Sequence, residues 1–205
     1  MTTGKIIKKS VGTFTLSVAM ATSVQAAEVE VLHWWTSGGE AKALGALKST
    51  LKGQGVEWTD MPVAGGGGSS AMTVLRSRVL SGNAPTAVQM MGYDILDWGE
   101  QGVVATLNDI AEAEGWDAVV PRALQAFSKY DGQWISAPVN IHSTNWVWGN
   151  KALMDELNIT VPQNWNDFIA AMEQVKAAGY VPLAHGGQAW QEATISDGVV
   201  MATGG

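Results

Sequence analysis

The sequence predicts an α/β protein whose central sheet is mostly parallel and covered by helices. The first observation is a series of three extended segments in residues 28–101, each followed by a helical one. Successive β-α units of this kind place their strands in parallel and pack the helices on the sheet. The second is composition, because 46% hydrophobic and 15% charged residues among 205 can bury a core. The length suits one large domain or two small ones.

The three β-α units follow from the spacing of their apolar residues. Alternating or short β-rich runs predict strands, and apolar residues three or four positions apart predict helices. Gly53 and Gly55 end the first helix, and the run Gly65 to Gly68 precedes the second. The predicted strands are 28–34, 56–63 and 86–90, and the predicted helices are 40–52, 69–80 and 93–101.

The rest of the chain does not continue the regular β-α pattern. Asp131-Gly132 predicts a hairpin turn, and Asn164 is expected to cap a helix, with Asp167 as its capping-box partner. A boundary between two parts of the chain is expected around 135–142. Helices are predicted at 121–128, 151–157, 165–178 and 190–202, and extended segments at 135–140, 143–148 and 180–184.

The head of the chain has the three zones of an export signal peptide. Lys5, Lys8 and Lys9 form a positive start, and the apolar stretch 11–21 is shorter than the roughly 20 residues that span a bilayer. Small residues favour cleavage after Ala26. The interpretation implies an exported protein, most simply in a bacterial periplasm. A buried N-terminal helix is the alternative.

Charge and composition exclude several classes of partner and chemistry. Removal of the three lysines in the head, from 12 basic and 19 acidic side chains, leaves a net charge of −10. Nucleic acid and anionic membrane surfaces are therefore disfavoured, because both attract clustered Lys and Arg. No further segment is long and apolar enough for membrane insertion. The absence of cysteine excludes disulfides and thiolate catalysis.

The sequence carries no pattern for a metal centre or a nucleophilic serine. His33, His142 and His185 stand far apart, with no pair at helical spacing. No G-x-S-x-G motif is present, and no two carboxylates can be placed across a scissile bond. The surroundings of His142 leave a cleft position open but favour a buried histidine with satisfied ring nitrogens.

Trp34, Trp35 and Glu40 follow the first predicted strand, where open α/β sheets bind ligands. Ten of the sixteen aromatic residues are Trp, and a flat indole packs well against the C–H face of a pyranose. A doubly covered sheet could equally bury the two indoles under its helices. Glu40 could accept hydrogen bonds from sugar hydroxyls, or could simply stabilise the start of its helix.

The glycine run between the second strand and its helix leaves two interpretations open. Gly66, Gly68 and Ala71 satisfy G-x-G-x-x-A, and Asp94 lies about 20 residues on, as in dinucleotide sites. Four consecutive glycines satisfy many patterns, however, and no Lys follows them as in a phosphate-binding P-loop. The alternative is a glycine-lined floor that brings backbone N–H groups close to a small ligand.

A second glycine loop, Gly186-Gly187, follows the predicted strand 180–184 and precedes Gln188 and Trp190. It repeats the combination of an amide and an indole at the carboxyl end of a strand. Ligand binding and ordinary packing both remain open for this loop.

Four stretches give the chain a recognisable resemblance: VLHWWTSGGEAKAL, VAGGGGSSAMTVLRSRVLSGNAP, WISAPVNIHSTNWVWGN and PLAHGGQAWQEA. In this order they resemble the periplasmic solute-binding proteins of ABC sugar importers, and most closely the glucose/mannose-binding group. The resemblance implies two α/β domains joined by a hinge, which close around one sugar without chemistry on it. It implies a monosaccharide ligand, a membrane permease as partner, no cofactor and a monomer when complete.

Carried over to this sequence, the resemblance implies a set of sugar-binding residues. Met91 departs from the pattern, because relatives tend to carry Lys or His at that position, which bears on the identity of the sugar. The implied residues are Trp34 and Trp35 flanking the sugar, Glu40 and Gln89 as polar contacts, Gly66 and Gly67 as backbone border, and His142, Gln188 and Trp190 as weaker transfers.

The resemblance also divides the chain into parts. Residues 1–26 are predicted to be the signal peptide, 27–138 the first α/β domain, and 139–205 part of a second α/β domain that is incomplete here. Family members are far longer, so we expect this sequence to be the amino-terminal part of such a receptor. An exported dinucleotide-dependent sugar oxidoreductase is the alternative from another class.

Overall fold

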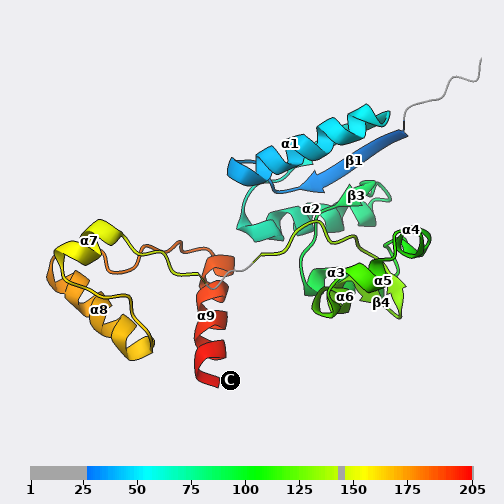
Figure 1. The fold of residues 1–205 in the computed structure, drawn as a ribbon. Helices are drawn as coiled ribbons and strands as arrows, with labels where there is room; N and C mark the ends of the chain where they lie inside the picture. The colour runs from blue at the N-terminus through cyan, green and yellow to red at the C-terminus, as the bar shows by residue number, and fades with distance from the viewer. Residues whose placement is uncertain (1–26, 143–145, 205) are drawn as a thin grey trace, which may run out of the picture.

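The computed structural model describes residues 27–142 and 146–204, which form a mixed α/β structure (Figure 1). The predicted signal peptide, residues 1–26, lies outside the described residues, and so do residues 143–145 of a predicted extended segment. A parallel sheet with flanking helices forms the first part of the chain, and the last three helices lie to one side of it.

The parallel sheet has three strands in the order β2-β1-β3. They are β1 (Ala27–His33), β2 (Val56–Pro62) and β3 (Ala87–Val88). β1 pairs with β2 along its whole length, from Ala27 opposite Val56 to His33 opposite Pro62. β3 is shorter than predicted, although the Gln89 N–H continues its ladder by donating to the Leu32 carbonyl at 2.9 Å. The predicted parallel sheet is confirmed.

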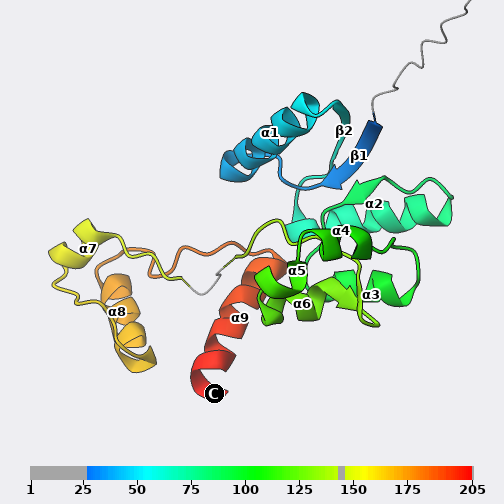
Figure 2. The same cartoon turned by 45° about the vertical axis from the view of Figure 1, so that its right-hand side comes forward.

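Helices follow the strands as the apolar spacing predicts. They are α1 (Gly38–Gly53), the 3₁₀ turn η1 (Gly66–Gly68), α2 (Ser69–Leu80) and α3 (Tyr93–Glu100). Figures 1 and 2 show α1 and α2 on opposite sides of β1. The strand therefore has both faces covered, which explains why its second half, Val31 to His33, is buried throughout rather than alternating.

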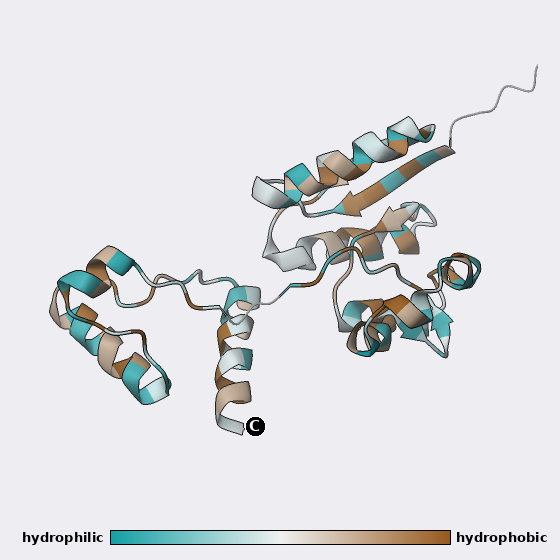
Figure 3. Ribbon diagram, viewed as in Figure 1, coloured by the Kyte–Doolittle hydropathy of each residue, from teal (hydrophilic) through white to brown (hydrophobic). Residues whose placement is uncertain are grey.

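The hydrophobic core lies between β1 and α2. Leu32 is fully buried, and its neighbours include Ala71, Met72 and Leu75 on one face of α2 and Trp98 of α3. In Figure 3 brown, hydrophobic residues alternate with teal ones along β1, and brown residues are present on α2 as well. Because α2 supplies three core residues at helical spacing, its packing fixes the end of β2 and the glycine turn that precede it.

Three short helices and a β-hairpin follow α3. Its elements are α4 (Asn108–Ala113), α5 (Trp116–Val119), α6 (Arg122–Ser128), β4 (Lys129–Tyr130) and β5 (Gln133–Trp134). Asp131 and Gly132 have φ of 48° and 75°, the positive values that a tight two-residue hairpin turn needs. The predicted Asp-Gly turn is confirmed, and it buries Trp134 edge-on against Trp116, with ring centroids 5.3 Å apart.

The last helices are α7 (Lys151–Glu156), α8 (Trp165–Ala177) and α9 (Ala189–Gly204). Asn164 caps α8 as predicted, because its side-chain oxygen accepts the Asp167 N–H at 3.0 Å. The Asp167 carboxylate reaches back to the Asn164 amide at 2.8 Å and to the Gln163 N–H, rather than to the Asn164 N–H of a standard capping box. In Figure 1, α7 and α8 extend away from the parallel sheet.

Three predicted extended segments do not form strands in the described part of the chain. Of these, only residues 180–184 were predicted as a strand, and they have no ladder partner there, so that prediction is wrong for this structure. In 135–140 the Ile135 N–H donates to the Ser128 carbonyl at 3.0 Å, just beyond the hairpin. An extended segment becomes a strand only when a neighbour accepts and donates its backbone hydrogen bonds. After α8 the Tyr180 N–H instead turns back to the Val175 carbonyl at 3.2 Å, which closes the helix end.

Leu32 gives a direct test of this core. Because its side chain is fully buried between β1 and α2, Leu32→Ala should lower the free energy of unfolding by about 2–5 kcal/mol. Leu80→Ala, at the 88% exposed end of α2, should change it by less than about 0.5 kcal/mol. Urea unfolding followed by circular dichroism measures both, and equal effects would contradict the assigned core.

Candidate functional site

The two tryptophans that follow strand β1 point their side chains to opposite sides of the sheet. The Trp34 side chain turns to the α2 side, where it packs against the core and lies beside Gly68. The Trp35 side chain lies on the α1 side, in a hollow of about 300 Å³ that Thr36 and Leu44 also line. Adjacent residues at a strand end point to opposite faces. The geometry thus places the two indoles on different sides of the sheet rather than around one point.

The glycine turn η1 lies where β2 passes into α2. Gly66, Gly67 and Gly68 have φ of 65°, 57° and 102°, which only glycine adopts without strain. A Cβ on Gly68 would lie 2.9 Å from the Trp34 ring, and one on Gly67 would lie 2.8 Å from the Trp190 ring. The turn therefore lacks side chains for two reasons at once: its backbone conformation, and the close approach of two indoles.

Trp190 reaches this turn from a distant part of the sequence. It lies in the first turn of α9, and that helix packs against η1. Its ring N–H donates to the Gln188 side-chain oxygen at 2.7 Å, while 45% of the residue remains exposed. The amide thus holds the indole on the glycine turn and leaves part of the ring accessible to a ligand.

Gln89 completes the group from the third strand. It follows β3 directly, and its side-chain oxygen accepts the Trp34 N–H at 3.2 Å. This bond crosses from the end of one strand to the end of its neighbour. The structure therefore brings together six of the predicted residues, here called the indole–glycine site: Trp34, Gly66, Gly67, Gln89, Gln188 and Trp190, with Gly68 beside them.

The other predicted residues lie elsewhere. Glu40 is exposed in the first turn of α1, and Trp35 lies on the α1 side as described. His142 is exposed, with its Nε2 atom 2.6 Å from the Asn140 amide nitrogen, so the preference for a buried histidine is wrong. Met91 is about half exposed beyond the end of β3.

A polar cluster on the α1 side was missed by the sequence analysis. Asp60 accepts hydrogen bonds from Trp58 Nε1 at 2.7 Å, from Lys48 Nζ and from the buried ring of His33, whose Nε2 lies 3.0 Å away. Partial burial raises the pKa of Asp60, but the hydrogen bonds from Lys48, Trp58 and His33 outweigh it and lower that pKa to about 2. Trp58 and Asp60 sit two positions apart on one strand face, the one regularity that could have indicated the cluster.

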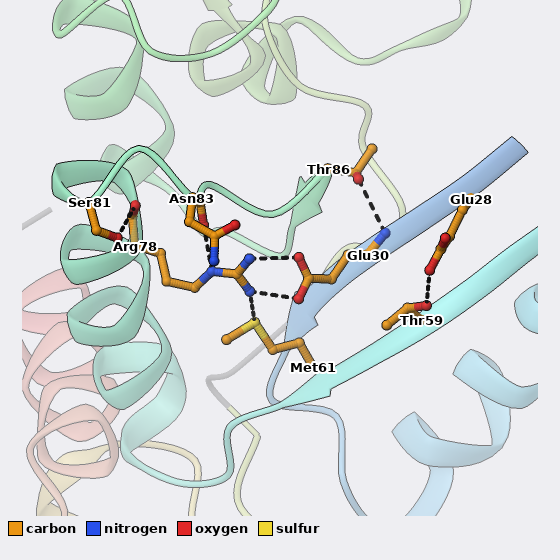
Figure 4. Close-up of polar contacts among 8 residues, drawn as sticks. All are labelled: Glu28, Glu30, Thr59, Met61, Arg78, Ser81, Asn83 and Thr86. Atoms are coloured by element: carbon orange, nitrogen blue, oxygen red, sulfur yellow. Dashed lines mark hydrogen bonds and ion pairs between the residues drawn. The ribbon is translucent and has the colours of Figure 1, made fainter.

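A second missed interaction ties α2 to the sheet (Figure 4). The Arg78 guanidinium donates to both carboxylate oxygens of Glu30 at 2.7 Å, and its Nε donates to the Asn83 carbonyl at 2.6 Å. The hydrogen bonds from Arg78 lower the pKa of Glu30, and the same bonds raise the pKa of Arg78. This ion pair holds the end of α2 against β1, at the opposite end of the helix from the glycine turn.

The described residues hold few other candidates for chemistry. Across 27–142 and 146–204, no group of three or more His, Cys, Asp or Glu side chains is arranged to hold a metal ion. No helix in those ranges combines the length and the apolar character needed to cross a membrane. Asp94, the acidic residue of the dinucleotide interpretation, lies in the first turn of α3, well beyond the end of β3.

The chain belongs to the bacterial extracellular solute-binding protein family, whose model matches residues 42–205. It is 62% identical over 185 residues to a probable sugar-binding periplasmic protein of Rhizobium meliloti, a match that covers 90% of this chain and 45% of that protein. It is 23% identical over 182 residues to a glucose-binding protein of Saccharolobus solfataricus, covering 84% of this chain and 33% of that one. The chain thus spans less than half the length of the curated relatives it matches.

Solved structures share the fold. The galacto-N-biose/lacto-N-biose I-binding protein of a Bifidobacterium longum ABC transporter matches with a TM-score of 0.56 at 19% identity, over 78% of this chain and 40% of that one. The predicted periplasmic-binding-protein-like α/β fold is therefore confirmed. Membership of a solute-binding protein family does not favour the alternative interpretation of the chain as a dinucleotide-dependent oxidoreductase.

Gly68 tests the close packing of the glycine turn. Gly68→Ala should lower the free energy of unfolding by about 1–3 kcal/mol, because a Cβ both collides with the Trp34 ring and strains a backbone at φ 102°. Gly45→Ala in the middle of α1 is the control, and it should raise stability by about 0.5–1 kcal/mol since nothing lies within 4 Å of its Cβ. The midpoints of urea unfolding measure both changes in stability. An unchanged midpoint for Gly68→Ala would argue against the position of the Trp34 ring beside Gly68.

Asp60 predicts a pH dependence of stability. Its pKa in the fold, about 2, lies below the ordinary value of 3.8, so its contribution is complete above about pH 4 and is lost as the pH falls toward 2. The urea midpoint should therefore fall over this window, and Asp60→Asn should flatten that fall. Asp109→Asn, which removes a carboxylate from α4, should leave the slope as it is. A slope that Asp60→Asn does not change would remove the Lys48–Asp60–His33 network as its cause.

Proposed function

We propose that this chain is the sugar-capturing part of a periplasmic receptor that delivers a monosaccharide to the permease of an ABC importer. One observation carries the proposal. Two indoles from distant parts of the sequence, Trp34 and Trp190, lie beside adjacent glycines of one turn, with the side-chain amides of Gln89 and Gln188 next to them. Family membership and the similarity to a probable sugar-binding periplasmic protein of Rhizobium meliloti support it.

The chemistry of the indole–glycine site suits a neutral sugar. An indole offers an apolar face to the C–H groups of a pyranose, and amide side chains both donate to and accept from its hydroxyls. Glycines let backbone N–H groups approach such a ligand closely. Small-ligand sites typically combine apolar walls with a few fixed polar groups in this way. Specificity would come from the arrangement of these groups, with no covalent step.

Within this proposal the sugar is glucose or mannose. The glucose-binding relative of Saccharolobus solfataricus supports a hexose of this size. Met91 follows Gln89 by two positions, and its thioether cannot supply the hydrogen bonds that a Lys or His at that position would give a sugar hydroxyl. Trp35, Glu40 and His142 stay predictions as sugar contacts, because they lie outside the indole–glycine site.

Transport would require a second wall and a hinge. The proposed division places residues 27–138 in a first α/β domain and residues from 139 onward in a second one. A sugar that binds the closed arrangement better than the open one shifts the equilibrium toward closure. Export by the predicted signal peptide would place the receptor in the periplasm, where the permease can receive the loaded form.

The test is a titration with glucose, mannose, galactose and maltose followed by tryptophan fluorescence. The protein is this chain in place of the matched part of the Rhizobium meliloti relative, which supplies the full length. We expect saturable binding of glucose or mannose. Trp190→Ala should weaken it at least about tenfold, since it removes the accessible indole face on which the sugar ring would pack.

Leu80→Ala is the control, because Leu80 is 88% exposed at the end of α2 and lies outside both the indole–glycine site and the apolar surface of residues 139–201, so its affinity should equal that of the parent. No fluorescence or calorimetric response to any of the four sugars would overturn the hexose proposal. Equal losses of affinity in Trp190→Ala and Leu80→Ala would remove the indole–glycine site as the place of binding.

A further inference from the structure

Large apolar side chains are exposed over the last third of the chain. Within residues 27–142 and 146–204, sixteen of the 24 exposed large hydrophobic side chains lie between residues 139 and 201. Monomeric soluble proteins seldom leave contiguous apolar patches larger than a few hundred Å² uncovered, and larger patches mark interaction surfaces. The first part of the chain, which has its own core under the sheet, shows far fewer.

This surface includes an apolar hollow of about 510 Å³ between α8 and α9, here called the α8–α9 groove. Glu173 and Lys176 also line it, so their charges cancel and the groove attracts neither a polyanion nor a polycation. Its apolar lining consists of Trp165, Phe168, Ile169, Met172, Pro182 and Val199.

Two non-helical segments also expose apolar side chains. Trp146, Val147 and Trp148 are exposed on the first, and Val181 and Leu183 are exposed on the second, on either side of the groove residue Pro182. Neither belongs to a strand pair in the described part of the chain. Unpaired extended backbone with apolar side chains is a template for a further strand. The occupant of this surface therefore brings both strands and an apolar face.

We propose that the α8–α9 groove and these two segments bind the part of a solute-binding polypeptide that lies outside its match to this chain, even when that part is supplied as a separate molecule. The Rhizobium meliloti relative is 62% identical here, yet this chain covers 45% of its length, so more than half of that protein remains to cover this surface. The inference depends on family membership and not on the identity of the sugar.

The experiment co-expresses the tagged chain with the half of the Rhizobium meliloti relative that lies outside the match. We expect capture of that half at one-to-one stoichiometry. Ile169→Asp, in the groove, should lower the captured amount at least about tenfold, because a buried charge without a partner is costly. Ile110→Asp, on α4, should leave capture unchanged, since the two isoleucines are matched at 53% and 54% exposure.

Val199→Asp, in the groove, and Val103→Asp, outside it, form a second pair at 36% and 49% exposure, which keeps the test valid if Ile169→Asp loses its helical circular dichroism. Failure to capture the complementary half, or equal capture by both members of each pair, would overturn the proposal. Light scattering on the chain alone addresses the other occupant. Self-association that Ile169→Asp abolishes, without capture of the relative's half, would assign the groove to a second copy and overturn the proposal as well. A negative sugar titration alone would leave the groove assignment intact.

Discussion

The parallel register of β1 between β2 and β3 is the constraint on which the rest of the structure depends. Parallel strands bring their carboxyl ends to one edge, so the residues that follow each strand become neighbours whatever their separation in sequence. Trp34 follows β1, the glycine turn follows β2, and Gln89 follows β3. The bond from the Trp34 N–H to the Gln89 side chain is a direct consequence of this register. A shift of one residue would send Trp34 to the α1 side and separate the three.

The core enforces the register. Leu32 must face α2 to be buried, and its neighbour in the sequence, Val31, must then face the other helix layer. The Arg78–Glu30 pair fixes the far end of α2 on the same strand, so the helix is held at both ends: by charge at its carboxyl end and by the glycine turn at its amino end. The sheet, α2 and the turn thus act as one rigid floor beneath Trp34.

Local patterns were sufficient to predict most elements of this floor, because each is short, amphipathic and punctuated by glycine. The limits of α2 and the Asp131-Gly132 turn follow from signals within a few residues. The strand predicted at 180–184 is absent for a related reason: a strand is defined by its partner, which a local pattern cannot supply. Predictions of helices survive the absence of neighbours, since their hydrogen bonds are internal.

The candidate site was predictable only in part. Glycine and tryptophan beside strand ends indicated its members, but their grouping was a matter of three-dimensional structure. Strand alternation allows Trp34 and Trp35 to point to opposite faces of the sheet, but nothing in the sequence shows that Trp190 would reach Gly67. The hydrogen bonds of His33 and Lys48 to Asp60 join α1, β1 and β2. Polar contacts between residues so far apart in the sequence produce no regular spacing from which they could be predicted.

The helix α9 connects the two surfaces that the chain presents. Its first turn carries Trp190 onto the glycine turn, and its last turns carry Val199 and Thr203 into the α8–α9 groove. A helix of this length is a stiff rod, so the position of one end restricts the other. The contact at Gly67 is small and the indole is half exposed, which leaves the helix lightly held at the site. A polypeptide bound in the groove would clamp the far end and so reduce the freedom of the indole. Ligand affinity at Trp190 would then depend on what covers the groove, because an indole already held in place costs less entropy to use in binding.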